Sequence, residues 1–392
     1  MAVATWRLDP DVVHLNHGSF GACPVEVLDL QGALRAEMEA NPVAFMLRRY
    51  QSALEDSRQA LAAFVGADAA GLVFVPNATY GVNSALRSIE GRLRPGSELV
   101  ITSHTYNACR NAVVVTAERA GATVVVADIP FPIAEPDEAV AAVVDVVTER
   151  TALVVIDHVT SPTGLCLPIE EIIAAIDPSV MVLVDGAHAP GMLDVDLSAL
   201  GASFYTANCH KWICAPKGAA FLWVADPFRQ SAIPASISHG YNDGWPGSGS
   251  RFHAQFDWTG TDDPTARLCV GQALETMAAH RSDGWPGIQV SNRELALAGR
   301  RVILEALDAA PPAPESMIGS IASVPVPPER EQSPGIFDPL TAALHANWSI
   351  EVPVFAWPES PRRLLRISAQ QYNTIDDYRA LAEALVAELD QT

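Results

Sequence analysis

"MVLVDGAHAPG", residues 181–191, and "FYTANCHKW", residues 204–212, are two apolar runs that pass directly into polar side chains. Short apolar runs of this kind predict buried strands of a parallel sheet. In open α/β sheets, ligands bind beyond the carboxyl ends of the strands, where loops and helix N-termini meet. We therefore expect a functional site at the ends of these two strands. Their polar ends contain Asp185, His188, Asn208, His210 and Lys211.

The same pattern continues on both sides of this stretch. Apolar strand-like runs alternate with helical stretches through the first two-thirds of the chain, which predicts an α/β fold with a mostly parallel central sheet and helices on both faces. The expected strands lie within 71–81, 97–104, 122–130 and 151–164, and the expected helices within 81–93, 138–150 and 168–176.

The pattern changes near residue 285. We expect a long amphipathic helix at 291–310, an irregular Pro-rich connection at 311–334, a strand at 362–370 and a closing helix at 374–389. The prediction is a large domain of residues 20–280 and a smaller α/β domain built from 1–19 and 281–392.

The composition narrows the classes of function. The formal net charge is −21, and no run of Lys and Arg exceeds two residues. Nucleic-acid binding is disfavoured, because it needs a basic surface. The chain shows no apolar segment of about 20 residues and no leader-like start, so we expect neither membrane insertion nor secretion. Its six cysteines form no C-x-x-C pair, which favours reduced thiols in a cytoplasm.

Lysine is rare in this chain. Of the 25 basic residues only Lys211 and Lys217 are lysines. A primary amine can form a Schiff base with an aldehyde, whereas a guanidinium stays protonated and cannot. Asp185 could pair with a protonated pyridine nitrogen, and Ala78 with Thr79, at the start of a helix, could bind a phosphate. Together these features describe a site for pyridoxal 5′-phosphate.

Other chemistries fit less well. The sequence holds neither a G-x-S-x-G elbow nor a G-x-x-x-x-G-K-[ST] loop. A metal-dependent hydrolase is the alternative of a different class, although its possible ligands match no compact metal motif. Those ligands would be His104, His158, His188 and His210 with Asp157 or Asp185.

Seven segments in the same order carry a family resemblance. They are "LNHGSFG" (15–21), "NATYGVN" (77–83), "DHVTSPTG" (157–164), "DGAHAPG" (185–191), "NCHKW" (208–212), "WTGTDDPTA" (258–266) and "RISAQQYNT" (366–374). The chain resembles the class V aminotransferase family of fold-type I pyridoxal-phosphate enzymes, and within it the isopenicillin-N-epimerase-like group. The resemblance implies a fold-type I architecture.

The resemblance also implies roles for single residues. Lys211 would be the Schiff-base lysine and the base that moves the Cα proton, Asp185 would bind the pyridine nitrogen, and His188 would bind the ring hydroxyl. The phosphate would be held by Ala78, Thr79, Asn208 and His210. Tyr106 would stack on the ring, with His104 as the alternative.

The substrate and the assembly follow from the same comparison. Arg366 would clamp the carboxylate of an amino-acid-like substrate, a task that suits its planar fork. Asn16, His17 and Ser161 would face that substrate. Thr261 would reach the cofactor phosphate of a partner subunit, which implies a homodimer.

Three reactions remain open after removal of the Cα proton. Elimination of a β-sulfur substituent needs one base on one face, so a carbon–sulfur β-lyase is our first expectation. An epimerase needs a second acid on the opposite face, where Tyr106 or His104 could serve, and an aminotransferase needs an acceptor substrate. The related cysteine desulfurases carry a loop cysteine that residues 344–369 lack, which disfavours persulfide chemistry on an enzyme thiol.

Overall fold

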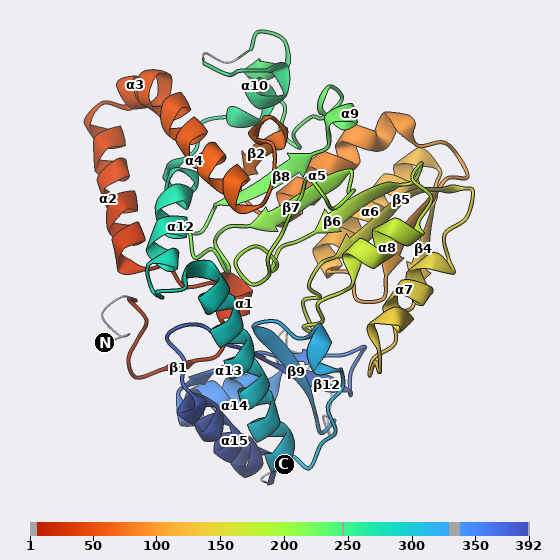
Figure 1. Cartoon of the computed structure of the whole chain (residues 1–392), viewed down its shortest axis with the longest axis vertical. Coiled ribbons are helices and arrows are strands. Elements are labelled where there is room, and N and C mark those ends of the chain that lie inside the picture. The colour runs from red at the N-terminus through yellow and green to blue at the C-terminus, as the bar shows by residue number, and fades with distance from the viewer. Residues whose placement is uncertain (1–5, 245–246, 329–337, 391–392) are drawn as a thin grey trace.

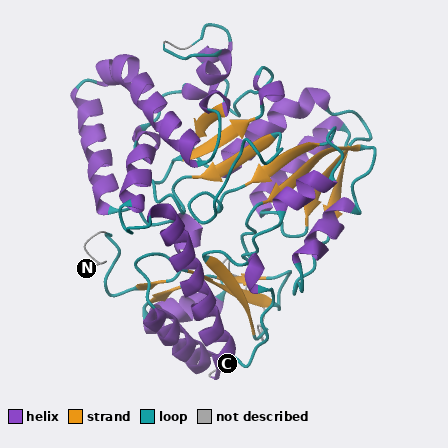
Figure 2. Cartoon of the chain, viewed as in Figure 1, coloured by secondary structure: helices purple, strands orange, loops and turns teal. Residues whose placement is uncertain are grey.

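A computed structural model of the 392-residue chain describes residues 6–244, 247–328 and 338–390. Its centre is a seven-stranded sheet in the order β2-β8-β7-β6-β5-β3-β4 (Figures 1 and 2). The strands are β2 (Leu72–Val75), β3 (Glu98–Thr102), β4 (Thr123–Ala127), β5 (Thr151–Asp157), β6 (Met181–Asp185), β7 (Phe204–Asn208) and β8 (Ala220–Val224). From β7 to β4 all neighbours are parallel, which confirms the predicted mostly parallel sheet.

One strand of this sheet is absent from the sequence-based prediction. β8 runs antiparallel to both β2 and β7, and each of its five residues is buried. It follows β7 by a short connection, which suffices for an antiparallel neighbour but not for a parallel crossover. The connection holds Lys211, so β8 fixes both ends of the lysine loop to the sheet.

Helices cover both faces, as predicted. Alternate strand residues feed two separate apolar clusters, since successive side chains point to opposite faces. Val155 and Leu183 pack with α5 (Ala78–Ile89) and α6 (Asn107–Ala120), whereas their neighbours face the other cluster. The other helices before residue 283 are α1 (His17–Phe20), α2 (Val25–Ala40), α3 (Pro42–Ala44), α4 (Tyr50–Phe64), α7 (Pro136–Val144), α8 (Ile169–Ala175), α9 (Asp226–Arg229), α10 (Arg251–Asp257), α11 (Thr265–Leu268) and α12 (Val270–Ala278).

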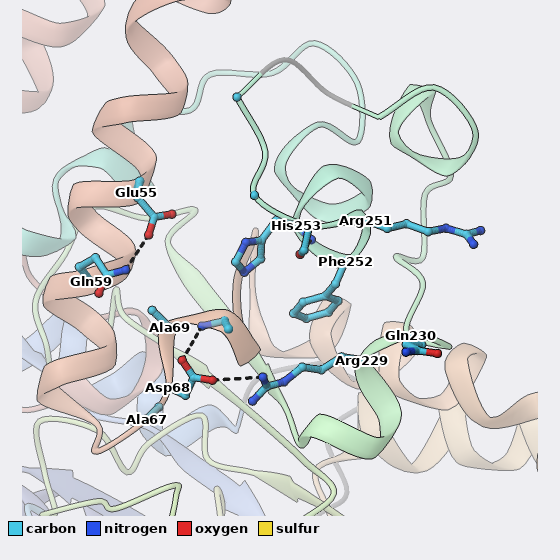
Figure 3. A pocket seen from close by; sticks show the side chains of 14 residues that line it. Glu55, Gln59, Ala67, Asp68, Ala69, Arg229, Gln230, Arg251, Phe252 and His253 are labelled. Atoms are coloured by element: carbon cyan, nitrogen blue, oxygen red, sulfur yellow. Dashed lines mark hydrogen bonds and ion pairs between the residues drawn. The ribbon is translucent and has the colours of Figure 1, made fainter.

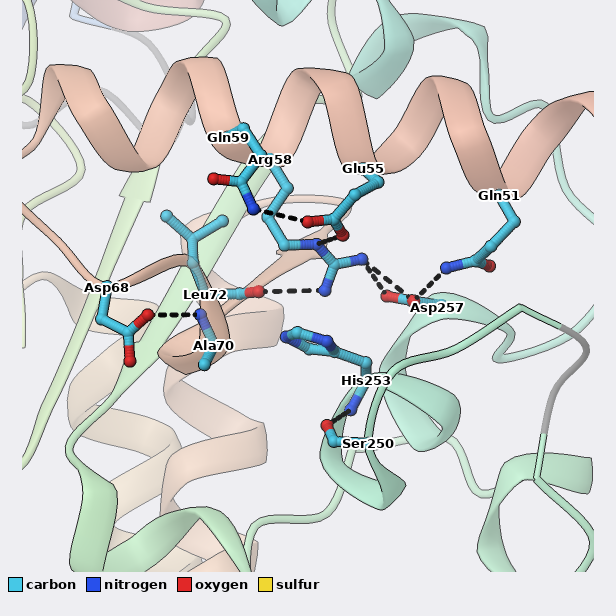
Figure 4. Close-up of polar contacts among 10 residues, drawn as sticks. All are labelled: Gln51, Glu55, Arg58, Gln59, Asp68, Ala70, Leu72, Ser250, His253 and Asp257. Atoms are coloured by element: carbon cyan, nitrogen blue, oxygen red, sulfur yellow. Dashed lines mark hydrogen bonds and ion pairs between the residues drawn. The ribbon is translucent and has the colours of Figure 1, made fainter.

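A buried ion pair joins α4 to α10 (Figure 4). The Arg58 Nη2 atom lies 2.9 Å from both carboxylate oxygens of Asp257, and neither side chain is exposed. Tyr50 donates a 2.8 Å hydrogen bond to the Asp257 carbonyl. Removing one partner of such a pair would leave an uncompensated buried charge, so the pair fixes the two helices relative to each other.

The C-terminal part forms a smaller α/β unit around an antiparallel sheet of order β11-β12-β9. Its elements are α13 (Gly284–Ala306), β9 (Ile321–Val326), α14 (Pro339–Trp348), β10 (Ile350–Glu351), β11 (Val354–Ala356), β12 (Arg363–Ser368) and α15 (Ile375–Asp390). β1 (Val13–His14) pairs with β10, so the N-terminal segment joins this unit. The domain limits at 19/20 and 280/281 stay a prediction.

The expectation of an irregular connection at 311–334 was wrong in part. Residues 321–326 form β9, which pairs along its length with β12. Pro325 is accommodated because β9 is an edge strand, where a missing backbone N–H disrupts no ladder on the outer side. Residues 329–337 of this stretch lie outside the described residues. Among the described helices, none has the length and apolar character to cross a membrane.

Candidate active site

Lys211 lies in the loop after β7 with its amine against His188. The Lys211 Nζ atom is 2.9 Å from His188 Nε2. On the other side of the ring, the Trp212 indole nitrogen is 3.4 Å from His188 Nδ1. An indole N–H only donates, so Nδ1 accepts and the neutral ring carries its proton on Nε2. Lys211 then accepts from Nε2, which only an unprotonated amine can do.

The local electrostatics agree with this assignment. Burial, reinforced by the charge of Arg366, lowers the pKa of Lys211 to about 7. Burial and the nearby Lys211 also lower the pKa of His188 well below its ordinary value. A lysine with a pKa near neutrality is a nucleophile at physiological pH.

Asp185 ends β6 beneath the first turn of α6. Its Oδ2 accepts from the Cys109 thiol at 3.0 Å, and its Oδ1 accepts from the Ala187 amide at 3.0 Å. Burial raises the pKa of Asp185. Gly186 is required next to it, because a Cβ there would lie 2.2 Å from the Tyr205 ring. A cationic ring nitrogen would compensate the buried carboxylate.

The predicted phosphate residues gather where α5 begins. The Asn77 side chain caps the helix by accepting from the Tyr80 amide, and the Asn208 side chain accepts from the Ala78 amide, both at 2.9 Å. The α5 N-terminus is therefore tied to the end of β7. A phosphate here would meet the positive end of a helix dipole, with half-buried Thr79 beside it.

His210 lies on the same loop, and its ring is anchored on one side. Its Nδ1 donates to the Ala219 carbonyl at 3.0 Å. In the neutral ring Nε2 therefore carries no proton and cannot donate. Burial lowers the pKa of His210 to about 4. His210 Nε2 would therefore donate to a phosphate only if the negative charge of that phosphate raised the pKa of the ring enough to protonate it.

Arg366, on β12, is a buried cation whose hydrogen bonds in the described structure go to neutral groups. Its Nη1 donates to the Ser161 carbonyl at 2.8 Å and to Ser161 Oγ at 3.2 Å, and its Nη2 donates to Ser19 Oγ at 3.0 Å. The guanidinium stacks 5.0 Å from the Phe355 ring centre. Within the described ranges no carboxylate forms an ion pair with Arg366, and its Nε has no hydrogen-bond partner. A buried cation without an internal counter-charge can bind an anionic group of a ligand.

The N-terminal motif supports this arginine and the lysine loop. Ser19 Oγ donates to Asn16 Oδ1 at 2.5 Å, so Asn16 orients the hydroxyl that receives Arg366. His17 is buried, and its Nε2 donates to the Lys211 carbonyl at 3.0 Å while its Nδ1 accepts from the Tyr372 hydroxyl at 3.0 Å. With both nitrogens engaged, His17 holds the lysine backbone in place.

The two aromatic candidates before α6 differ in access. His104 is buried, with Nδ1 2.7 Å from Thr163 Oγ1 and Nε2 3.1 Å from the Ile129 carbonyl. Tyr106 precedes the first residue of α6 and is 45% exposed. Only Tyr106 of the two is therefore free to contact a ligand. Thr261 is exposed in the single chain, on the loop between α10 and α11.

A cavity of about 1130 Å³ lies elsewhere, beside the start of β2 and the end of β8 (Figure 3). These are the strand ends opposite to those that carry Asp185 and Lys211. Two of its polar pairs are satisfied internally: Arg229 pairs with Asp68 at 3.1 Å, and Gln59 donates to Glu55 at 2.7 Å. The cavity therefore offers less chemistry than the strand-end cluster.

The alternative metal site would be formed by the four histidines and two aspartates named in the sequence analysis. The histidines proposed as ligands point to separate partners, with His158 Nδ1 3.0 Å from the Tyr205 hydroxyl. Within the described residues no group of three or more His, Cys, Asp or Glu side chains is arranged to hold a metal.

Sequence reasoning missed several neighbours of the site. Cys109 and Trp212 were not assigned roles, and Asp157 was considered only as a metal ligand. Their contacts depend on residues distant in the chain: Cys109 is 76 positions from Asp185. Asp157 ends β5 just as Asp185 ends β6. This equivalent position is the feature of the sequence that indicates a role for Asp157 at the site.

The sequence of this chain is similar to those of a known enzyme family and of several of its members. The model of the class V aminotransferase family matches residues 22–281. Isopenicillin N epimerase of Amycolatopsis lactamdurans is 34% identical, over 96% of this chain and 95% of its own length. Putative L-cysteine desulfhydrase 1 of Oryza sativa subsp. japonica is 30% identical, over 95% of this chain and 82% of its own length.

Solved structures support the fold. A complex of the cystine C–S lyase C-DES with cysteine persulfide has a TM-score of 0.77 at 20% identity, and covers 96% of this chain and 98% of that one. The cysteine desulfurase CsdA from Escherichia coli has a TM-score of 0.76 at 20% identity, and covers 99% and 97%. Together with the family match, these likenesses confirm the predicted fold-type I architecture. The chain belongs to the class V aminotransferase family.

Proposed function

We propose that this protein is a carbon–sulfur β-lyase that eliminates the β-sulfur substituent of an L-cysteine-type substrate. The observation that carries the proposal is the presence in one site of a Lys211 amine whose pKa is lowered to about 7 and a buried Arg366 guanidinium that has no carboxylate partner among the described residues. One group can remove a Cα proton, and the other can bind an α-carboxylate. The similarity to L-cysteine desulfhydrases adds the substrate class.

The cofactor is pyridoxal 5′-phosphate, as membership of the class V aminotransferase family confirms. The residues present fit its three functional parts. Lys211 suits the aldehyde, the buried Asp185 carboxylate suits the ring nitrogen, and the α5 N-terminus with Thr79, Asn208 and His210 suits the phosphate. Bound pyridoxal phosphate supplies an aldehyde that condenses with amines and a ring that stabilises the charge left by proton loss.

The side chains of this chain would then divide the work. Arg366 binds the substrate carboxylate through two parallel N–H donors, with Ser161 and Ser19 holding the guanidinium plane. This contact orients the substrate so that its Cα–H bond faces Lys211. Lys211 takes the proton as the general base, and its low pKa matches that task at neutral pH.

The overall reaction balances without an oxidant. The Cα–H and Cβ–S bonds break, and the sulfur leaves as hydrogen sulfide or a thiol after taking up a proton. The three-carbon product is hydrolysed to pyruvate and ammonia. Elimination thus needs a single base on one face, which Lys211 provides.

Epimerisation is the second candidate, because two isopenicillin N epimerases are 34% and 32% identical to this chain, against 30% for putative L-cysteine desulfhydrase 1. It needs a second acid on the opposite face. His104 has both ring nitrogens engaged inside the protein, which leaves Tyr106 for that role. The structure therefore supports the lyase more directly than the epimerase. Aminotransferase activity is the third candidate.

The deciding experiment incubates the loaded enzyme with L-cysteine, S-substituted cysteines and other L-amino acids in deuterated water. Pyruvate with a stoichiometric thiol is the expected result. Deuterium at Cα with inverted chirality and no pyruvate would establish the epimerase instead. Accumulation of the pyridoxamine form of the cofactor would establish the aminotransferase. A Lys211→Ala protein is the control and should give none of these products.

We also infer a homodimer. The exposed Thr261 lies on a chain segment that, by the family resemblance, reaches the partner's cofactor. Large apolar side chains are exposed elsewhere on the N-terminal half, among them Phe20 at 73% and Val43 at 60%. Mixing Thr261→Ala and Lys211→Ala proteins should give a dimer in which one site has lost both residues and the other neither. A monomer by light scattering would contradict this inference.

A further inference from the structure

Asp157 and Asp185 form a pair of buried carboxyl groups that the proposed reaction does not account for. They are register partners at the ends of β5 and β6, so their side chains leave the sheet on the same face. They are 3% and 4% exposed. Two carboxylates this close, away from water, cannot both be ionised at neutral pH.

The hydrogen bonds show which of the two is better prepared to carry the charge. Asp185 accepts from the Cys109 thiol and from the Ala187 amide, both at 3.0 Å. Asp157 Oδ1 accepts a long 3.4 Å contact from the Tyr106 amide. In the part of the chain that the structure describes, Asp157 Oδ2 has no partner. An oxygen without a donor is where a carboxyl group holds its own proton.

The surrounding charges favour the same assignment. Burial and the charge of Asp185 raise the pKa of Asp157 well above its ordinary value. The positive charge of Lys211, when present, acts on Asp185 in the opposite direction. The titratable groups that act on the pair from the neighbouring elements are Cys109, Arg110, Tyr205 and Lys211.

We propose that Asp157 is a positioning residue that keeps its proton in the folded protein, so that Asp185 carries the single negative charge facing the ring nitrogen of the cofactor. Asp157 acts through Asp185 and touches neither substrate nor reacting atoms. A second charge at position 157 would repel the first and make Asp185 prone to protonation, which would weaken its hold on a cationic ring. The assignment of the ring nitrogen to Asp185 rests on the proposed function, whereas the proton on Asp157 does not.

Infrared spectroscopy of the cofactor-free full-length protein tests the proton directly. The difference between wild type and Asp157→Asn at pH 7 should contain the carbonyl stretch of one protonated carboxyl group, which shifts in deuterated water. Asp257→Asn is the matched control, because Asp257 is equally buried but ion-paired with Arg58. That variant should lose only carboxylate bands. Loss of carboxylate bands alone in Asp157→Asn would overturn the proposal.

A second variant keeps the test independent of how well Asp157→Asn folds. In Asp185→Asn the neighbouring charge is gone, so the protonated band of Asp157 should disappear at a pH lower by about one unit or more. An unchanged titration would show that Asp185 does not hold the proton on Asp157, and would refute the pairing. Both measurements use cofactor-free protein, so they stand even if the lyase reaction is not found.

The effect on the cofactor is a separate readout. A carboxamide resembles a protonated carboxyl group in shape and charge, so Asp157→Asn should retain pyridoxal phosphate with an affinity within about threefold of wild type. Asp185→Asn should lose affinity by tenfold or more, about the worth of one charge-assisted contact. Equal losses in both variants would mean that Asp157 carries a charge of its own at the site, contrary to the proposal.

Discussion

Replacing Arg366 by methionine should lower activity by ~30-fold or more while leaving the fold almost as stable as before. Arg366 is buried without a carboxylate partner in the described ranges, and burial lowers its pKa to about 10. That change corresponds to about 3 kcal/mol against the charged form. Losing the hydrogen bonds to Ser161 and Ser19 costs about 1 kcal/mol each, which offsets the gain. The free energy of unfolding should therefore change by no more than about 1 kcal/mol.

The effect on catalysis should be far larger. Truncating one partner of a buried charge pair costs about 2–5 kcal/mol, which is ~30-fold to several thousandfold. For Arg366→Met this loss should fall on kcat/KM, because the carboxylate is bound at Arg366 and the misplaced Cα–H bond also lowers kcat. Rates of pyruvate release at several L-cysteine concentrations would measure it.

Arg58 provides the matched control, since it is also a fully buried arginine but pairs with Asp257. Arg58→Met should lose about 3–5 kcal/mol of stability, because it leaves Asp257 buried and uncompensated. Its remaining folded fraction should keep a normal kcat. Both proteins would be compared by chemical denaturation without cofactor, so that ligand binding does not contribute. If Arg366→Met is destabilised as much as Arg58→Met, or keeps kcat/KM within tenfold of wild type, Arg366 is structural and the reasoning fails.

Three further predictions concern the cofactor end of the site. Cofactor-free protein should take up pyridoxal phosphate faster as pH rises through about 7 and then level off, because only the unprotonated Lys211 amine attacks the aldehyde; a rate independent of pH between 6 and 8 would contradict this. Trp212→Phe removes the donor that sets the neighbouring imidazole tautomer, and should slow that uptake about fivefold, the worth of ~1 kcal/mol, as followed by absorbance. Gly81→Ala places a Cβ 2.0 Å from Thr206 Oγ1 and should lower the free energy of unfolding by about 1–3 kcal/mol, as measured by chemical denaturation, and weaken phosphate binding. Gly91→Ala, with nothing within 4 Å, should change neither.

Sequence patterns predicted the parts of the fold that depend on local periodicity. The strands from β2 to β7 were expected because each is a short apolar run bounded by loop residues. β8 was overlooked although all five of its residues are buried, because it follows the lysine loop without a helix and breaks the alternating order. β9 was hidden by prolines, whose exclusion from strands does not hold at a sheet edge. In both cases the deciding fact was the position of the strand in the sheet.

The site was predictable in its residue types and less so in its protonation states. An amine and a carboxyl group at neighbouring strand ends predict the cofactor by their chemistry alone. The proton on His188 cannot be assigned from local sequence, since its position depends on the indole of Trp212 on one side and on Lys211 on the other. For Asp157, the deciding fact is the lack of a donor to Oδ2 in the described structure, which no local pattern encodes.

Arginine shows most clearly why function needs the three-dimensional contacts. Arg58 and Arg366 are chemically identical and equally enclosed, and both follow apolar or small residues in unremarkable surroundings. Arg58 meets one carboxylate 199 positions away, that of Asp257, and a second three positions before it, that of Glu55. In the described structure Arg366 meets serine oxygens, one of them 205 positions away, and the Phe355 ring, but no carboxylate. A buried charge that pairs with a side chain of opposite charge helps to hold the fold together. A buried charge without such a partner can instead pair with a charged group of a ligand. The distinction between a structural and a functional arginine therefore lies in what faces it, and the two methionine variants would measure that difference.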